Sequence, residues 1–342
     1  MKTLNHQINH IHFKGVLMKH SRAMLWPVFA LAGLLAAGCN KDSTTSPPTD
    51  TAPPNVTNEQ SARVYFANTD EFVNNDEQTI DDQDIQPTDY SVGEFGKIDT
   101  AITPLRWGRF VRQVVRTVTD TVSPGDSIAV VHIHKVISGV LKIRGIRTGD
   151  TVLVQKTFTD TAERNLIFRR VGHETKRFWM NWVPVATSLV AGGTIPPDNN
   201  IAITQIELIS AGGTITVTDP LQYYLRYRWV NLWHRGNNDV PELQSGTVDT
   251  IRVTLLSNSS DTDIVALRFG VGTFFKRRMR MNIVSEQNNG NGTFTRVFQT
   301  PFRVHFHKGW FHAAVDAATK ATLYDDTAPY SVSWWGIPYR VF

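Results

Sequence analysis

From Trp107 onward, apolar and polar residues alternate along the chain, and this alternation predicts an all-β structure. Successive side chains of a β-strand point to opposite faces of a sheet, so alternation is typical of strands that bury one face. β-Branched and aromatic residues are frequent in these runs, and turn-forming residues interrupt them at short intervals, which favours antiparallel sheets. The predicted strands cover residues 110–122, 127–146, 151–158, 166–171, 177–183, 201–209, 213–218, 221–233, 248–256, 264–270, 277–284, 294–298, 302–307 and 331–341.

Turn-forming residues separate several of these strands. Ser123-Pro124-Gly125-Asp126 and Thr148-Gly149-Asp150 are predicted turns, because their residue types favour tight changes of direction. Only residues 311–324 also allow a helical or mixed interpretation, and a continuing strand explains them equally well. The sequence shows no repeat with a period of about 20 to 50 residues, so a solenoid or a propeller is not expected.

The strands are predicted to form two antiparallel β-sandwich domains, at residues 101–218 and 219–342, because the chain exceeds the usual length of one domain. We place the boundary at the turn-forming sequence Thr218-Asp219-Pro220. The second domain has about seven strands, which resembles an immunoglobulin-like (Ig-like) sandwich. It lacks the Cys…Trp…Cys pattern of true immunoglobulin domains, so this resemblance concerns architecture alone.

Two polar segments precede the strands. Residues 39–60 are rich in Pro, Ser and Thr and have little apolar surface to bury, so we expect a disordered tether. Residues 61–100 form an acidic lead-in, with ten acidic residues and one lysine between positions 68 and 99. Clustered carboxylates allow a calcium loop. The segment lacks the glycine and the final glutamate of an EF-hand loop, and a solvated acidic run is the preferred interpretation.

A short apolar segment at residues 24–37 has the features of an export signal. Its 14 residues are fewer than the roughly 20 that a membrane-spanning helix needs. Lys19 and Arg22 precede it, and small residues follow it up to Cys39, which is the three-part layout of a secretory signal. Met18 begins a more typical signal than Met1 does, and the sequence leaves both starts open.

The run Leu35-Ala36-Ala37-Gly38-Cys39 resembles the lipobox of bacterial lipoproteins, with Ala36 at the position where leucine is usual. This resemblance covers residues 18–39 and implies that residues 1–38 are a signal peptide that is removed. It further implies that Cys39 carries a diacylglycerol thioether and an acylated amino group. The resemblance thus implies a lipid anchor in the cell envelope, and Asn40 favours the outer membrane under the lipoprotein sorting rule. The alternative is a cysteine buried in an ordinary core helix.

Charge and cysteine content exclude several classes of function. Four of the 35 basic residues precede Cys39 and none of the 31 acidic residues does, so the remaining chain carries 31 of each. Such a neutral body argues against nucleic acid as a partner, because phosphate binding depends on excess Lys and Arg. Cys39 is the only cysteine, so its acylation would exclude disulfides, thiolate zinc sites and a cysteine nucleophile.

Two His-x-His pairs are candidate metal ligands, one in Val131-His132-Ile133-His134-Lys135 and one in Val304-His305-Phe306-His307-Lys308. On a strand, residues i and i+2 share a face, so each pair could offer two imidazoles to one ion. His312 or Asp316 could complete the second set, which makes His305, His307 and His312 the preferred candidates. Spacing alone fixes no third ligand, and histidines on the solvent face of a half-buried strand are the simpler interpretation.

Aromatic residues near arginines are candidate binding residues. Arg226, Arg228 and Trp229 could form a platform that stacks on sugars and bonds to anionic groups. A core strand with paired outer arginines is the favoured alternative. Trp334 and Trp335 would contribute to binding if they were partly exposed, but closing a core is the commoner role for such residues.

No known catalytic signature occurs in the sequence, whether Gly-x-Ser-x-Gly, His-Glu-x-x-His or a glycine-rich phosphate loop. We therefore expect a non-catalytic binding or structural module of the cell envelope, with a protein or glycan partner and no cofactor. The alternative is a metal-dependent or hydrolytic envelope enzyme that uses the C-terminal histidines.

Overall fold

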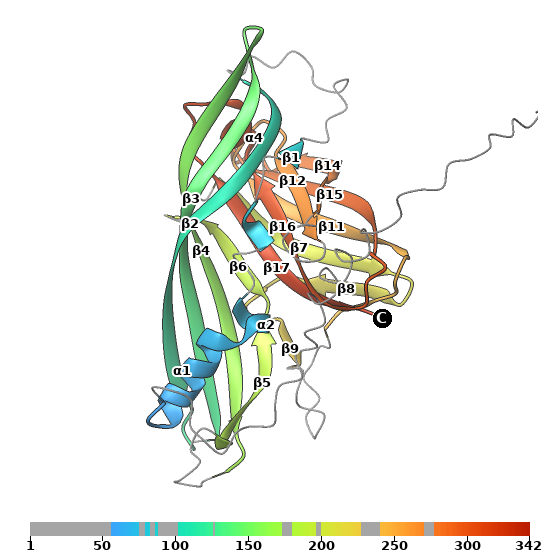
Figure 1. Cartoon of the computed structure of the whole chain (residues 1–342). Coiled ribbons are helices and arrows are strands. Elements are labelled where there is room, and N and C mark those ends of the chain that lie inside the picture. The colour runs from blue at the N-terminus through green and yellow to red at the C-terminus, as the bar shows by residue number, and fades with distance from the viewer. Residues whose placement is uncertain are drawn as a thin grey trace, which may run out of the picture. The chain divides into compact units, whose positions relative to one another are not determined.

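The strands of this chain form two sheets in the computed structural model, which describes residues 56–74, 79–82, 86–87, 102–125, 127–172, 180–195, 200–226, 240–269 and 277–342 (Figure 1). These residues all belong to one compact unit, Asp50–Phe342. Neighbouring strands are antiparallel except for one short parallel pair, β10 with β17.

The larger sheet has 12 described strands, and its main path runs β1-β2-β3-β4-β6-β17-β16-β12-β13. β10 pairs with β17, and β5 joins β4 to β9. Its strands are β1 (Gln86–Pro87), β2 (Thr103–Val122), β3 (Ile128–Arg147), β4 (Asp150–Arg170), β5 (Trp182–Ser188), β6 (Val190–Thr194), β9 (Tyr224–Arg226), β10 (Glu242–Leu243), β12 (Ile264–Phe269), β13 (Arg277–Arg280), β16 (Gly309–Ala318) and β17 (Val332–Val341).

The smaller sheet has five described strands in the order β14-β15-β11-β7-β8. They are β7 (Ile201–Ser210), β8 (Gly213–Val217), β11 (Val248–Ser257), β14 (Asn282–Asn288) and β15 (Phe294–Arg303). β11, β7 and β15 alternate between buried and more exposed residues, as expected for strands that turn one face to a core. β14 lies at the edge of this sheet, and all its residues are exposed.

Long strands β2, β3 and β4 dominate the N-terminal half of the chain. A two-residue turn joins β3 to β4, with Thr148 at φ 49° and Gly149 at φ 95°, and Arg147 lies opposite Asp150. Positive φ at both positions matches the type I′ hairpin turn, which suits the twist of antiparallel strands. The predicted turn at this position is therefore confirmed. Because the register between β3 and β4 continues without a bulge, the turn fixes every cross-strand pair in the hairpin.

The described helices are short and pack on the sheet. α1 (Glu59–Thr69) begins at a capping box in which the Asn58 side chain accepts a hydrogen bond from the backbone of Ser61, at 2.7 Å. α2 (Glu71–Asn74) follows it directly. These residues belong to the end of the predicted tether and to the predicted acidic lead-in, where the sequence pattern indicates no helix. Residues 311–324, which had an open interpretation, form most of β16 and all of α4 (Lys320–Tyr324).

Three apolar clusters hold the elements together. α1 and α2 cover one face of β3, β4 and β5 through Ala67, Val73, Val131, Ile133 and Phe168. A second cluster surrounds Trp334 in the larger sheet, and the third lies between the two sheets. Figure 1 shows α1 lying along the lower half of β2–β4, on this covered face.

An all-β, antiparallel architecture is confirmed, whereas the division into two sandwiches at residue 218 is not. Both sheets take strands from either side of that position, since β6 pairs with β17 and β7 pairs with β11. The turn at 218–220 marks a local change of direction only. No helix in the described ranges is both long and apolar enough to cross a membrane.

Candidate functional site

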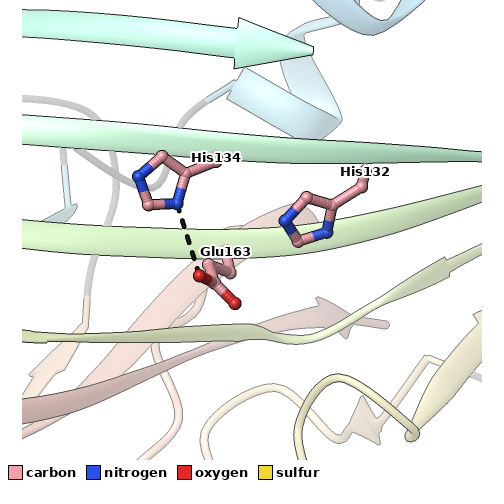
Figure 2. A group of neighbouring side chains, drawn as sticks. All are labelled: His132, His134 and Glu163. Carbon is pink, nitrogen blue, oxygen red and sulfur yellow. Dashed lines mark hydrogen bonds and ion pairs between the residues drawn. The ribbon is translucent and has the colours of Figure 1, made fainter. Parts of the chain in front are cut away.

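The N-terminal His-x-His pair lies on the face of β3 that α1 does not cover. Val131 and Ile133 point to the covered face and are buried, so the intervening His132 and the following His134 point to the opposite face. We call this opposite side of β2, β3 and β4 the outer face. Both histidines and Glu163 on β4 are half-buried there (Figure 2).

His132, His134 and Glu163 come close enough to act together. The β3–β4 register places Glu163 directly opposite His134, and their nearest atoms, Nδ1 and Oε1, are 3.3 Å apart. One potential ligand atom from each of the three residues lies within 4.8 Å of the other two. Figure 2 shows the carboxylate of Glu163 next to the ring of His134, to which a dashed line joins it, with the ring of His132 nearby. Within the described residues, this is the one set of three His, Cys, Asp or Glu side chains with such geometry.

Asn165 of β4 orients His132. The two residues lie opposite each other in the β3–β4 register, next to the pair of His134 and Glu163, and Oδ1 of Asn165 is 2.9 Å from Nδ1 of the His132 ring. The Nδ2 of Asn165 donates to the carbonyl of Leu221 at 3.4 Å, and its backbone N–H donates to Ser188 Oγ at 2.9 Å. Since the Leu221 carbonyl can only accept, Oδ1 is left facing the imidazole, and Nδ1 of His132 is the donor. The lone pair of Nε2 then stays available to a ligand.

The preferred C-terminal histidines do not assemble into a comparable set. His305 Nε2 lies 3.1 Å from the hydroxyl of Tyr339, and its ring packs edge-on against Phe311. His307 is exposed. Burial, together with the positive charges of Arg164 and Lys135, lowers the pKa of His312 to about 3. That histidine is therefore a neutral, half-buried residue of β16 beside two cations.

The predicted aromatic binding residues have different surroundings. Trp334 and Trp335 are buried in the core, which is the commoner role for such residues. Arg226 is half-buried at the end of β9. Arg228, Trp229 and the lipidation candidate Cys39 lie outside the described residues.

A buried network of charged side chains lies on the covered face of the larger sheet. Arg109 of β2 contacts Asp316 of β16 at 2.5 Å and donates to the Tyr330 hydroxyl at 2.9 Å. It also lies 3.6 Å from Asp160 of β4, to which Tyr330 donates at 3.0 Å. Arg268 of β12 contacts the same carboxylate of Asp316 at 2.9 Å. The network thus joins β2, β4, β12 and β16.

Asp81 and Asp82, which belong to the predicted acidic lead-in, are part of this framework. Asp82 is buried and contacts Arg268 at 2.6 Å, and Asp81 accepts from the backbone N–H of Val111 at 2.8 Å. Burial raises the pKa of Asp82, but Arg268 and Arg278 outweigh it and leave the pKa below its usual value. These two carboxylates therefore bind protein groups, and the rest of the acidic run lies largely outside the described residues.

The carboxyl of Asp160 is the titrating member of the network. Burial raises its pKa to about 7, although Arg109 and the hydrogen bond from Tyr330 oppose this shift. The folded protein therefore holds a proton on Asp160 between about pH 4 and 7, where an unfolded aspartic acid has lost it. This carboxyl consequently makes the fold less stable as pH rises through that window, and its effect levels off above pH 7.

We expect the variant Asp160→Asn to remove this pH dependence. Urea unfolding of the natural protein and the variant from pH 4 to 8 measures it. The stability of the natural protein relative to the variant should fall from pH 4 to about 7 and then stay level. Contributions of other titrating residues cancel in the comparison, and two parallel stability curves would contradict the assignment.

The sequence pattern does not single out Glu163 and Asn165, because residues 159–165 fall between two predicted strands. In the structure β4 is continuous from Asp150 to Arg170. The predicted turn nevertheless contains the information that pairs His134 with Glu163. His134 lies 13 residues before Arg147 and Glu163 lies 13 residues after Asp150, so a two-residue turn at 148–149 pairs them.

Two imidazoles and one carboxylate form a ligand set for divalent transition metals, with coordination positions left for water or another ligand. The described surroundings include an orienting amide, Asn165, and half-exposed ligands. This arrangement can hold a cation on the outer face of the sheet.

Neither a protein-family model nor a curated protein matches this sequence.

Proposed function

We propose that this protein is a lipid-anchored component of the bacterial cell envelope, held in the outer membrane through Cys39. In this proposal its β-sheet unit is a non-catalytic binding module for a protein or glycan partner. The observation that carries the proposal is the run Leu35-Ala36-Ala37-Gly38-Cys39 after a short apolar segment. Acyl chains contribute about 0.8 kcal/mol for each buried CH₂, so several chains give a lasting anchor.

The outer face supports a binding role for the sheet. Val115, Ile128 and Val130 are exposed there, and β-strand alternation and register place them on the same side as His132. Single exposed aliphatic residues are ordinary. Here they share one face with a candidate ligand-binding group, which makes this face the preferred contact surface. A metal-dependent enzyme built on His305, His307 and His312 is not proposed, because these residues form no such set.

Mass spectrometry of the native protein from its own bacterium tests the anchor. We expect an N-terminal Cys39 that carries the diacylglyceryl and N-acyl groups, in the outer-membrane fraction. The variant Cys39→Ser should lose these groups and leave that fraction. A native chain with a free Cys39 thiol and an uncut Gly38–Cys39 bond would overturn the proposal.

Site-specific photo-crosslinking in intact cells tests the binding module. A photoreactive residue at position 130, on the outer face, should yield a discrete adduct with an envelope protein or glycan. Position 284 on the edge strand β14 is the matched control, because Val284 is also an exposed valine on a strand. Equal adducts at both positions, or no adduct at position 130, would contradict a partner at the outer face.

A further inference from the structure

We infer that His132, His134 and Glu163 form a binding site for a divalent transition-metal ion on the outer face of the β3–β4 hairpin. This inference goes beyond the proposed function, and it holds whether or not Cys39 is acylated. It rests on the placement of three ligand types on one face, on their separations and on the residue that orients them.

The separation between His134 and Glu163 suits a shared metal ion. Zinc bonds to histidine nitrogen and carboxylate oxygen are about 2.0–2.1 Å long, so two ligand atoms of a tetrahedral ion lie about 3.3–3.4 Å apart. The Nδ1 of His134 and the Oε1 of Glu163 are 3.3 Å apart, which is long for a charge-assisted hydrogen bond. All three ligand atoms already lie within 4.8 Å of one another. In the proposed site, rotation of the half-buried His132 side chain brings the third ligand atom to the ion.

Asn165 supplies the orienting contact that metal-binding histidines usually have. Ligating imidazoles commonly use their second ring nitrogen to donate to an oxygen acceptor, which fixes the tautomer and the ring orientation. The Oδ1 of Asn165 accepts from Nδ1 of His132 at 2.9 Å, so Nε2 carries the lone pair. Asn165 is itself held by Leu221 and Ser188.

The cross-strand neighbours of the site add no positive charge that would oppose a cation. Thr117 and Thr119 of β2 lie opposite His134 and His132, and Ala191 of β6 lies opposite Glu163. The nearby cations Lys135 and Arg164 are adjacent in sequence but point to the covered face, where both are buried. The direct cross-strand neighbours of Glu163 and of the two histidines are thus uncharged on β2 and β6.

Zinc titration of the full-length, untagged chain carrying Cys39→Ser tests the site without any thiol. Isothermal titration calorimetry should detect one equivalent of Zn²⁺ that is lost, or weakened at least 10-fold, in His132→Gln, His134→Gln and Glu163→Gln. Asn165→Leu should weaken it by about 10- to 100-fold, as expected for an orienting residue. The double variant His305→Gln/His307→Gln is the matched control, because it removes the other His-x-His pair and should leave this equivalent unchanged.

Two outcomes would overturn the inference. One is the absence of any Zn²⁺ equivalent that depends on His132 and His134. The other is an equal loss of binding in the control variant, which would place the ion elsewhere among the histidines.

Cobalt substitution provides a readout that does not depend on variants. Co²⁺ bound by two imidazoles, a carboxylate and water in a tetrahedral site gives intense visible absorption, and addition of Zn²⁺ should abolish it. A weak octahedral spectrum with no Zn²⁺ competition would contradict the site. Failure of the Cys39 experiment leaves these results unaffected, so the two proposals can fail separately.

Discussion

Replacing Arg109 with methionine is expected to destabilise the fold by about 3–5 kcal/mol, because the change removes one partner from a buried ion network. Arg109 is 1% exposed and bridges Asp316, Asp160 and Tyr330. Arg268 still contacts Asp316 in the variant, whereas Asp160 loses its contact with Arg109 and retains the hydrogen bond from Tyr330. Urea unfolding at pH 8, where Asp160 is ionised in the natural protein, measures the loss.

A second replacement distinguishes lost charge balance from lost packing. Arg109, Arg268 and Arg278 face Asp82, Asp160 and Asp316, so the ionised network has three charges of each sign. The double variant Arg109→Met/Asp160→Asn restores the balance. It should be more stable than Arg109→Met by more than about 1 kcal/mol, because it also removes the carboxylate that has lost its cation. The effects of the two replacements on the free energy of unfolding are therefore not expected to add, as is usual for residues in contact.

The exposed ion pair of Arg340 with Glu242 is the matched control. It is similarly short, at 2.7 Å, but the Arg340 side chain is 47% exposed. Arg340→Met should cost less than about 1 kcal/mol, because solvent screens exposed pairs. Equal losses for Arg109→Met and Arg340→Met would show that burial does not govern the energetics of this network.

Strand positions were largely predictable because alternation is a local property. β3 alternates over 20 residues, and its predicted range of 127–146 differs from the observed strand by one residue at each end. The turn at Thr148-Gly149 was predictable for the same reason, since its residue types determine it. Pairing between distant strands is not local, so the local sequence at 218–220 predicts a domain boundary although β6 pairs with β17 across it.

The buried network could not be predicted from the sequence. Alternation treats a charged residue as solvent-facing, yet Arg268 lies in a strand whose residues are all buried. Its partners Asp82 and Asp316 are 186 and 48 positions away along the chain. Only the tertiary fold brings the opposite charges together and offsets the cost of burying them. The His132–Glu163 site is intermediate in how well the sequence predicts it. Its prediction requires one correctly placed turn and one unbroken strand.

The two faces of the β2–β4 segment therefore have different roles: one contributes to stability and the other carries the candidate binding residues. The covered face carries the α1 contacts and the ion network, whereas the outer face carries the candidate metal ligands. Because alternate residues of one strand serve each face, substitutions at His132 or His134 should alter metal affinity with little effect on unfolding. Substitutions of the network residues should do the reverse.

Replacing Trp334 with alanine is expected to cost about 3–5 kcal/mol, the range for large-to-small changes of buried aromatic residues. Trp334 is 0% exposed in the centre of the larger sheet and lies directly opposite Gly192 of β6. Trp310 on the adjacent strand β16 is only half-buried, so Trp310→Ala is a matched control with an expected cost of about 1 kcal/mol. Chemical unfolding of both variants measures the difference, and equal costs would contradict it.

Gly192 shows why this tryptophan fits. A Cβ atom at position 192 would lie 2.1 Å from Cε2 and 2.3 Å from Cζ2 of the Trp334 ring, so the glycine provides the space that the indole occupies. Gly192→Ala should therefore destabilise the natural protein by about 1–3 kcal/mol through overpacking. In the Trp334→Ala background the clash is absent, and the same substitution should cost much less. Additive costs in this double-variant cycle would show that the indole and the glycine do not depend on each other.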